Sequence, residues 1–411
     1  MSFARFTQLL LFMFLGMVAA ASGWAQTYEA LYSFTGGADG AFPEGSLIRD
    51  SSGSLYGTTV GTGIGGVIAG SVFKLSAGGK FTPLYNFGAG NAGPSESLVR
   101  DSAGNLFGTT YEGGQGNGTV FKLDRKNNFS VIYKFPGGAS GAGPVLFTLD
   151  RAGNLYGEAG GGSYFCDGAD HFGCGLVFKL DPSGNETVLH AFKDGKSGSF
   201  PGGGLLRNAA GNLYGTTRGS FNPYSVVVFE LDPAGHETVL YRFDRKGQGN
   251  GPAPNGDLIQ DAAGNFYGTT FWGGSQAGIC KGYGPCGLVF KLDPNGNETV
   301  LYTFTGQADG FNPVGGLVMD SAGNLYGTTR HGGLFSNTCE VGCGVVFKLD
   351  PSGKETVLYS FTGGADGFWP YAGLTRDARG NLYGTTSRGG NNNDCLVYSE
   401  VGCGVVFKIR P

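Results

Sequence analysis

Short runs rich in β-branched and aromatic residues recur along the chain and are separated by turn residues. In one representative stretch these runs are Gly316–Asp320, Asn324–Thr329, Gly344–Leu349 and Glu355–Phe361. Residues of these types favour strands, and no segment shows the 3.6-residue apolar period of an amphipathic helix. We therefore predict four strands in this stretch and almost no helix in the protein.

The joints between the predicted strands carry turn chemistry. The segment DSAGN joins the first two strands, where Gly323 is free to take a positive φ and Asp320 can bond to the turn backbone. DPSGK joins the last two strands in the same way. Aspartates equivalent to Asp320 recur, and we predict that they stabilise turns; the whole set is Asp50, Asp101, Asp150, Asp261, Asp320 and Asp377.

This four-strand unit is repeated seven times. The phrase GNLYGTT, or a close variant, recurs at intervals of 49 to 59 residues, each time followed by VFKL and, in the first six repeats, by ETVLYSF or variants of them. Its central glycines are Gly57, Gly108, Gly157, Gly215, Gly268, Gly327 and Gly384. A period near 50 residues with four strands in each repeat is typical of a β-propeller.

The two ends of the chain predict how the ring closes. Tyr28–Phe34 has the sequence of a fourth strand without a blade, and Gly404–Ile409 is a third strand without a fourth. We therefore expect an all-β fold, a seven-bladed β-propeller of four-stranded blades over residues 26–411, in which the N-terminal strand closes the seventh blade. A linear solenoid is the alternative, but it would need polar caps at both ends, and the sequence shows none.

Residues 1–25 have the layout of a secretory signal peptide. Arg5 precedes an apolar run from Leu9 to Ala21, and Gly23-Trp24-Ala25 offers a cleavage site. The alternative is a membrane anchor, but the run is shorter than the roughly 20 residues that a span needs. We expect secretion to the extracellular space or periplasm, and no membrane span in the mature chain.

The eight cysteines form four close pairs, each in the predicted loop between a second and a third strand. The pairs are Cys166/Cys174, Cys280/Cys286, Cys339/Cys343 and Cys395/Cys403. An exported chain with paired cysteines predicts disulfides. A zinc site is the alternative, but no CxxC spacing occurs and no histidine recurs beside the pairs.

Composition narrows the classes of partner. Charged residues are 15% of the chain and the net charge is −4, which argues against a basic nucleic-acid binder. Glycine is abundant at 80 residues, but 32 Phe and 19 Tyr are enough to fill a core. We expect a monomer that needs no metal and no cofactor.

The repeat wording resembles a known family. DSAGNLYGTT, GCGVVFKLDPSGKETVLYSFTGGADG and their variants are similar to the tandem repeat of the GloVer (Gloeobacter–Verrucomicrobia) proteins over residues 27–411. This resemblance implies a secreted or surface bacterial protein of undefined activity. Members often carry a C-terminal sorting segment, whereas this sequence stops at Pro411 after a strand, which favours free secretion. The repeat is less similar to NHL-type and streptogramin-lyase propellers.

A binding site is expected on the face that carries the second-to-third loops and the blade-to-blade crossings, which we call the loop face. Long loops on a rigid frame usually carry binding. Aromatic and polar residues predicted on this face are candidates for sugar stacking and hydrogen bonding: Trp272, Asp309, Phe311, His331, Asp366, Trp369 and Tyr371. Packing between blades is the alternative role for the aromatic residues. Asp39, Asp309 and Asp366 could also be calcium ligands, although a turn role is favoured.

Three functions remain open from sequence. The first is a non-catalytic propeller that binds a glycan or a surface protein on the loop face. The second is a propeller lyase or hydrolase with His331 or His171 as general base. Such an enzyme would be distinguished by polar residues around the axis that occur in some blades and not in others. The third is a structural envelope or matrix protein.

Overall fold

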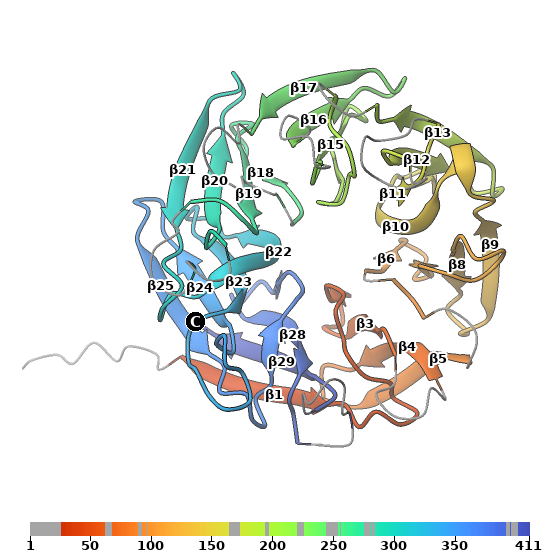
Figure 1. Ribbon diagram of the computed structural model, residues 1–411. Helices are drawn as coiled ribbons and strands as arrows, with labels where there is room; N and C mark the ends of the chain where they lie inside the picture. Colours follow the sequence, from red (N-terminus) through yellow and green to blue (C-terminus); the bar gives the residue numbers. More distant parts are fainter. Residues whose placement is uncertain are drawn as a thin grey trace, which may run out of the picture.

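The computed structural model describes residues 26–61, 68–88, 93–95, 97–163, 173–193, 197–219, 226–243, 254, 256–274, 280, 284–391, 395 and 402–411. Seven antiparallel sheets are arranged in a ring (Figure 1). The predicted seven-bladed propeller is confirmed. Helical structure in the described part is limited to the short 3₁₀ turn η1 (Gly138–Ser140) and single residues beside undescribed segments. The predicted signal peptide lies outside the described residues.

The strands of each blade follow one another in the sheet. Blade 1 contains β2 (Ile48–Arg49), β3 (Leu55–Thr59), β4 (Ile68–Leu75) and β5 (Phe81–Gly88). Blade 2 contains β6 (Val99–Arg100), β7 (Leu106–Thr110), β8 (Thr119–Leu123) and β9 (Phe129–Lys134). Blade 3 contains β10 (Ala142–Leu149), β11 (Leu155–Gly160), β12 (Leu176–Leu180) and β13 (Glu186–Ala191). Blade 4 contains β14 (Leu206–Arg207), β15 (Leu213–Thr216), β16 (Val227–Leu231) and β17 (Glu237–Arg242).

The remaining blades keep this order. Blade 5 contains β18 (Ile259–Gln260), β19 (Phe266–Thr270), β20 (Leu288–Leu292) and β21 (Glu298–Thr303). Blade 6 contains β22 (Phe311–Met319), β23 (Leu325–His331), β24 (Val345–Leu349) and β25 (Glu355–Ser360). Blade 7 contains β26 (Phe368–Pro370), β27 (Thr375–Arg376), β28 (Leu382–Arg388) and β29 (Val405–Arg410), and β1 (Thr27–Ser33) completes it.

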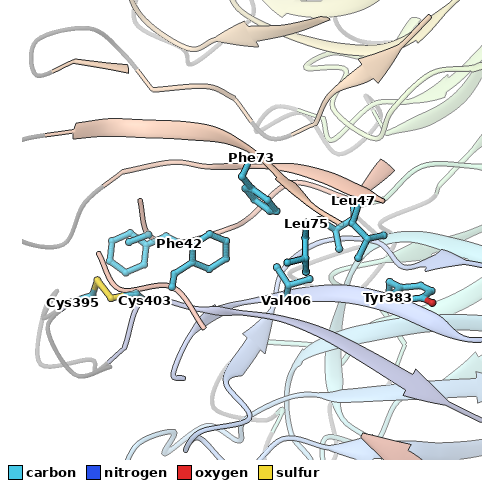
Figure 2. Packing of buried hydrophobic residues seen from close by; sticks show 11 residues of the cluster. Phe42, Leu47, Phe73, Leu75, Tyr383, Cys395, Cys403 and Val406 are labelled. Carbon is cyan, nitrogen blue, oxygen red and sulfur yellow. A yellow bond between two sulfur atoms is a disulfide. The ribbon is translucent and has the colours of Figure 1, made fainter. Parts of the chain in front are cut away.

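The N-terminal strand closes the ring as predicted. β1 pairs antiparallel with β29 from Thr27 opposite Arg410 to Ser33 opposite Val405. In Figure 1 the first and last strands lie side by side. Phe34, which follows β1, is fully buried, and the core beside it includes Phe42, Phe73, Val406 and the Cys395–Cys403 bond (Figure 2). Closure therefore joins the two ends through both backbone pairing and a shared core.

One predicted strand boundary needs correction. The first strand of blade 6 begins at Phe311, not at Gly316, and its register with the second strand shifts between Val314 and Val318. The irregularity lets the chain pair before and after the Gly315-Gly316 segment. Sequence alternation could not reveal this extension, since a proline and two glycines interrupt it.

The recurrent aspartates hold the first-to-second turns, as predicted. Asp320 Oδ1 accepts hydrogen bonds from the amides of Ala322 and Asn324 at 2.9 Å. Its Oδ2 accepts from Asn324 Nδ2 at 2.8 Å and from the Tyr326 hydroxyl at 2.9 Å. A single carboxylate thus satisfies four donors at one turn, which fixes the start of the second strand.

Close packing explains the central glycine of GNLYGTT. A Cβ at Gly57 would lie 2.7 Å from the Phe73 ring and 2.8 Å from Leu47. The Phe of VFKL is fully buried in every blade, so its ring occupies the space that a side chain on the neighbouring strand would need. The glycine and the phenylalanine are therefore a matched pair.

The fourth strands also contact one another across the blade boundaries. Where the next blade presents an aromatic ring, a tyrosine stacks on it, as Tyr85 does on Phe129 with ring centres 4.1 Å apart. At two boundaries the tyrosine donates to a glutamate of the next blade: Tyr133 bonds to Glu186 at 2.6 Å and Tyr241 to Glu298 at 2.6 Å. Tyr302 donates to Asp309 instead, at 3.0 Å. Blade 3 departs from this pattern because it carries His190 in the tyrosine position.

Candidate functional site

Disulfides hold the long loops of the loop face. Cys280–Cys286, Cys339–Cys343 and Cys395–Cys403 are bonded within single loops, as predicted. Cys174 is also disulfide-bonded, and Cys166 lies outside the described residues. Each of these three disulfides restricts the conformations of one second-to-third loop and does not link one blade to another.

The stapled loops are tied to the crossing that follows them. In four blades a residue with φ between 53° and 60° precedes a proline at the start of the blade: Phe42, Phe200, Asn312 and Trp369. The amide of each donates to the carbonyl of the preceding loop's second cysteine, for example Trp369 to Cys343 at 2.9 Å. The next proline then packs on a glycine of the previous blade. The loop face is therefore built as a connected rim.

Two predicted site residues hold this rim. Asp309 and Asp366 are each 9% exposed. Asp366 accepts hydrogen bonds from the Tyr359 hydroxyl at 2.9 Å and from the amide and hydroxyl of Thr362. Asp309 is bound in the same way by its own crossing. The oxygens of both carboxylates are engaged inside the turn, in agreement with the turn role.

Four further predicted residues lie together between blades 6 and 7. Phe311 is buried in the core, and its ring lies 5.2 Å from that of His331. Burial and the nearby charge of Arg330 lower the pKa of His331 to about 3. The Arg330 guanidinium lies 5.1 Å from the Trp369 ring centre and 5.2 Å from that of Tyr371. The rings of Trp369 and Tyr371 thus already contact a cation of the protein itself.

The last predicted residue stands apart from this group. Trp272 is half-buried and packs edge-on against Phe271, with ring centres 4.8 Å apart. It belongs to the loop after β19 in blade 5. His171, an alternative general base, lies outside the described residues. The structure therefore does not gather all seven predicted residues into one site.

A narrow polar channel marks the axis of the ring. All seven blades contribute to its lining, mostly through small residues such as Ser46, Ser97 and Gly373. Phe147, Arg218 and Asp257 also line it. Phe147 and Arg218 at the same time line a larger neighbouring cavity.

This second space, which we call the blade 3 cavity, has a volume of about 520 Å³ and lies beside the channel on the loop face. Tyr111 and Glu112 come from the loop after β7, and Phe200 and Arg218 come from blade 4. Phe147 and Glu158 come from blade 3 itself. Such a volume, with aromatic walls and a few polar groups, is typical of a small-molecule site.

Blade 3 departs from the repeat at the residues that form this cavity. Glu158 and Ala159 stand where the other six blades have two threonines. Phe147 stands three residues after the crossing proline, where the other blades have glycine, serine or aspartate. All three departures line the cavity. Substitutions scattered by chance would not gather at one space, so the cavity is a distinct feature of this blade.

The carboxyl group of Glu158 is buried without a partner. Glu158 is 3% exposed, and neither of its carboxyl oxygens has a hydrogen-bond partner among the described residues. Burial raises the pKa of Glu158 well above its ordinary value; the charge of Arg218 opposes this shift and that of Asp257 adds to it. Burial thus disfavours the charged carboxylate of Glu158. Perturbed groups of this kind gather at functional sites.

Sequence reasoning missed this site because it weighed exposed aromatics and histidines rather than departures from the repeat. The change from GTT to GEA in the third repeat was the available signal. In the described part of the chain no group of three or more His, Cys, Asp or Glu side chains is placed to hold a metal ion. A search of the same residues found no helix with the length and apolar character of a membrane span.

The fold and its axial channel define a seven-bladed β-propeller. Models of the Gloeobacter/Verrucomicrobia repeat match residues 15–170 and 164–398. The chain belongs to this repeat family, as its repeat wording indicated. The search of curated proteins found no match.

Solved structures are similar to this chain at low sequence identity. The extracellular domain assigned to a one-component system of B. thetaiotaomicron is 12% identical, with a TM-score of 0.55; the alignment covers 93% of this chain and 40% of that one. A gluconolactonase from Xanthomonas campestris is 13% identical, with a TM-score of 0.43, and covers 73% of this chain and 86% of its own. The first similarity shows the propeller fold; neither indicates a ligand.

Proposed function

We propose that the protein is a secreted, non-catalytic propeller that binds a glycan in the blade 3 cavity on its loop face. The observation that carries this proposal is the convergence of three repeat-breaking residues, Phe147, Glu158 and Ala159, on one cavity. If these positions served only to close the ring, we would expect the residues of the other blades: glycine, serine or aspartate in place of Phe147, and threonines in place of Glu158 and Ala159. We therefore infer that these three residues have a role other than holding the ring together.

The lining suits a sugar. The rings of Tyr111, Phe147 and Phe200 offer flat apolar faces, on which the C–H face of a sugar packs. Glu112 and Arg218 supply hydrogen-bonding groups for hydroxyls at the rim. Tyr111 is 67% exposed, which is unusual for a large ring unless a partner covers it.

The stapled rim supports binding by preorganisation. The amide of Phe200 donates to the carbonyl of the disulfide-bonded Cys174 at 2.7 Å. One wall of the cavity is thus anchored on a disulfide-bonded cysteine of blade 3. A wall that is ordered before binding loses less entropy when the ligand arrives. The disulfides and the signal-like N-terminus together support an extracellular or periplasmic location.

A polysaccharide lyase or hydrolase is the second candidate. Glu158 favours it, because a buried carboxylic acid with a raised pKa is the usual form of a general acid. Glu112 is a second carboxyl group of the same cavity. The blade-specific polar set that an enzyme requires is therefore present beside the axis.

One experiment separates the two candidates. The mature protein is incubated with bacterial and plant polysaccharides, and both retention on the polymer and release of reducing or unsaturated ends are measured. We expect retention without product, and loss of retention in Phe147→Ser, which restores the residue of blades 1 and 2. Trp272→Ser is the control distant from the cavity lining. Product release would establish the enzyme, and no retention on any polymer would refute the binding proposal.

A further inference from the structure

The position of Glu158 can be compared with six internal references. Threonines occupy the same place in the second strands of the other blades: Thr58, Thr109, Thr216, Thr269, Thr328 and Thr385. All six are buried. The Thr328 hydroxyl contacts the carbonyls of Val314 and Ala372 at 3.2 Å, the latter in the next blade. At four of the other positions the threonine hydroxyl is buried without a hydrogen-bond partner among the described residues: Thr109, Thr216, Thr269 and Thr385. Glutamate is longer and reaches the blade 3 cavity instead.

The strands beside Glu158 offer it no charged partner. β10 carries no charged residue, and the lysine of β12, Lys179, pairs with Tyr156 two residues away. From blade 4, Arg218 faces the cavity, but its Nη2 donates to the carbonyl of Gly202 at 2.7 Å. Glu112 of blade 2 is the other acidic residue of the cavity lining, and Asp257 of blade 5 lines the neighbouring channel.

We infer that Glu158 determines ligand specificity: its buried carboxyl group, which has no hydrogen-bond partner among the described residues, donates a hydrogen bond from its O–H to an oxygen of a neutral sugar in the blade 3 cavity. This inference rests on the proposed function and specifies its ligand class. An unpartnered buried O–H gains most from a ligand acceptor, because the alternative is an unsatisfied group. A sugar hydroxyl can accept that hydrogen bond and donate to the carbonyl oxygen of the same acid.

The charges around the cavity argue for a neutral ligand. Besides Glu158, the lining carries one group of each charge, Glu112 and Arg218. A cationic amino sugar would be repelled by Arg218 and attracted by Glu112, and an anionic uronic acid the reverse, so the lining favours neither charge. A neutral sugar avoids both penalties and still uses the aromatic walls.

The experiment compares wild type with Glu158→Gln and Glu158→Thr. The probes are neutral gluco-, manno- and xylo-oligosaccharides, oligogalacturonides and chitosan oligosaccharides, and affinity is measured by isothermal titration calorimetry. Gln keeps a neutral donor of the same shape, so we expect neutral-sugar affinity to change little. Thr removes the donor from the cavity, and we expect a loss of roughly tenfold or more. Thr269→Ser is the matched control in blade 5.

Two measurements distinguish a role of Glu158 in ligand specificity from a purely structural role. Glu158→Thr should melt at a higher temperature than wild type while binding less, because threonine fits this site in six blades and removes a buried unpartnered carboxyl group. Wild-type affinity should fall as the pH rises and Glu158 ionises, whereas the affinity of Glu158→Gln should not change over the same pH range. A merely structural role would not produce this difference in pH profile.

The outcomes separate the two proposals. If wild type binds neutral oligosaccharides and Glu158→Thr binds them equally well, this inference is overturned and the binding function stands. A preference for oligogalacturonides or chitosan oligosaccharides also overturns it. If wild type binds none of the probes, the proposed function fails and the inference fails with it.

Discussion

The contact between blades 3 and 4 is the one where a histidine replaces the usual tyrosine, and it allows a quantitative test of the interblade contacts. His190 Nε2 lies 3.6 Å from Glu237 Oε2, too far for a hydrogen bond. At the next boundary the Tyr241 hydroxyl donates to Glu298 at 2.6 Å. Burial raises the pKa of Glu237 to about 7 and lowers that of His190. Glu237 is thus desolvated without the donor that its counterpart has.

We expect His190→Tyr to supply this donor and to stabilise the protein. A hydrogen bond to a charged group contributes about 1.5–3 kcal/mol. Glu237 is only partly buried, and solvent screening reduces the gain to about 1 kcal/mol. His190→Phe is the control, because it fills the same space without a hydroxyl. Tyr241→Phe should show the reverse effect at the intact boundary.

The assay is urea unfolding of each variant across the pH range that ionises Glu237. The folded pKa of about 7 lies above the ordinary 4.5, so in wild type this group's contribution to stability is lost as the pH rises through that window. The advantage of Tyr over Phe should be largest above about pH 7 and shrink as Glu237 becomes protonated, since the neutral acid accepts less strongly. Equal stability of the two variants at every pH would refute the reasoning.

Three further predictions concern the ring, the rim and the turns. Deleting Tyr28–Phe34 should lower the melting temperature markedly, because β1 and the fully buried Phe34 close blade 7; an unchanged value would contradict the clasp. Gly404→Ala should destabilise the protein by more than the roughly 1–2 kcal/mol of left-handed backbone strain, because the new Cβ would lie 2.5 Å from Pro43. Gly79→Ala is the control: Gly79 also has a positive φ but open space around it, so its substitution should show the strain alone. Asp320→Ala should cost about 1–2 kcal/mol in denaturant unfolding, whereas Asp320→Asn should be milder because Asn208 already holds the same turn in blade 4; equal losses would argue against the turn role.

The turn aspartates also give a pH dependence with a defined sign. For Asp320, burial pushes the pKa up, but the hydrogen bonds from Asn324, Tyr326 and the turn amides outweigh it and leave the pKa below 3.8. Its contribution to stability is therefore present above the unfolded pKa and is lost as the pH falls through the folded one.

The repeat itself determined the architecture from sequence. Strand composition, Asp–Gly turns and a period near 50 residues require only local chemistry and counting, so they fixed the number of blades and the pairing of β1 with β29 before any coordinates. The disulfide pairs followed for the same reason, because their partners are close in sequence. Each of these features depends on neighbours along the chain or on exact repetition.

Tertiary structure alone decided where the irregular residues meet. Trp369 and Tyr371 were candidates for ligand stacking, yet both lie against Arg330, a contact that no spacing predicts. Phe147, Glu158, Phe200 and Arg218 come from separate segments of two blades and converge only when the ring forms. The charge state of Glu158 likewise depends on burial by neighbours distant in sequence. Repetition specifies a scaffold locally, whereas a site requires a particular set of side chains to share one space, and that is a property of packing.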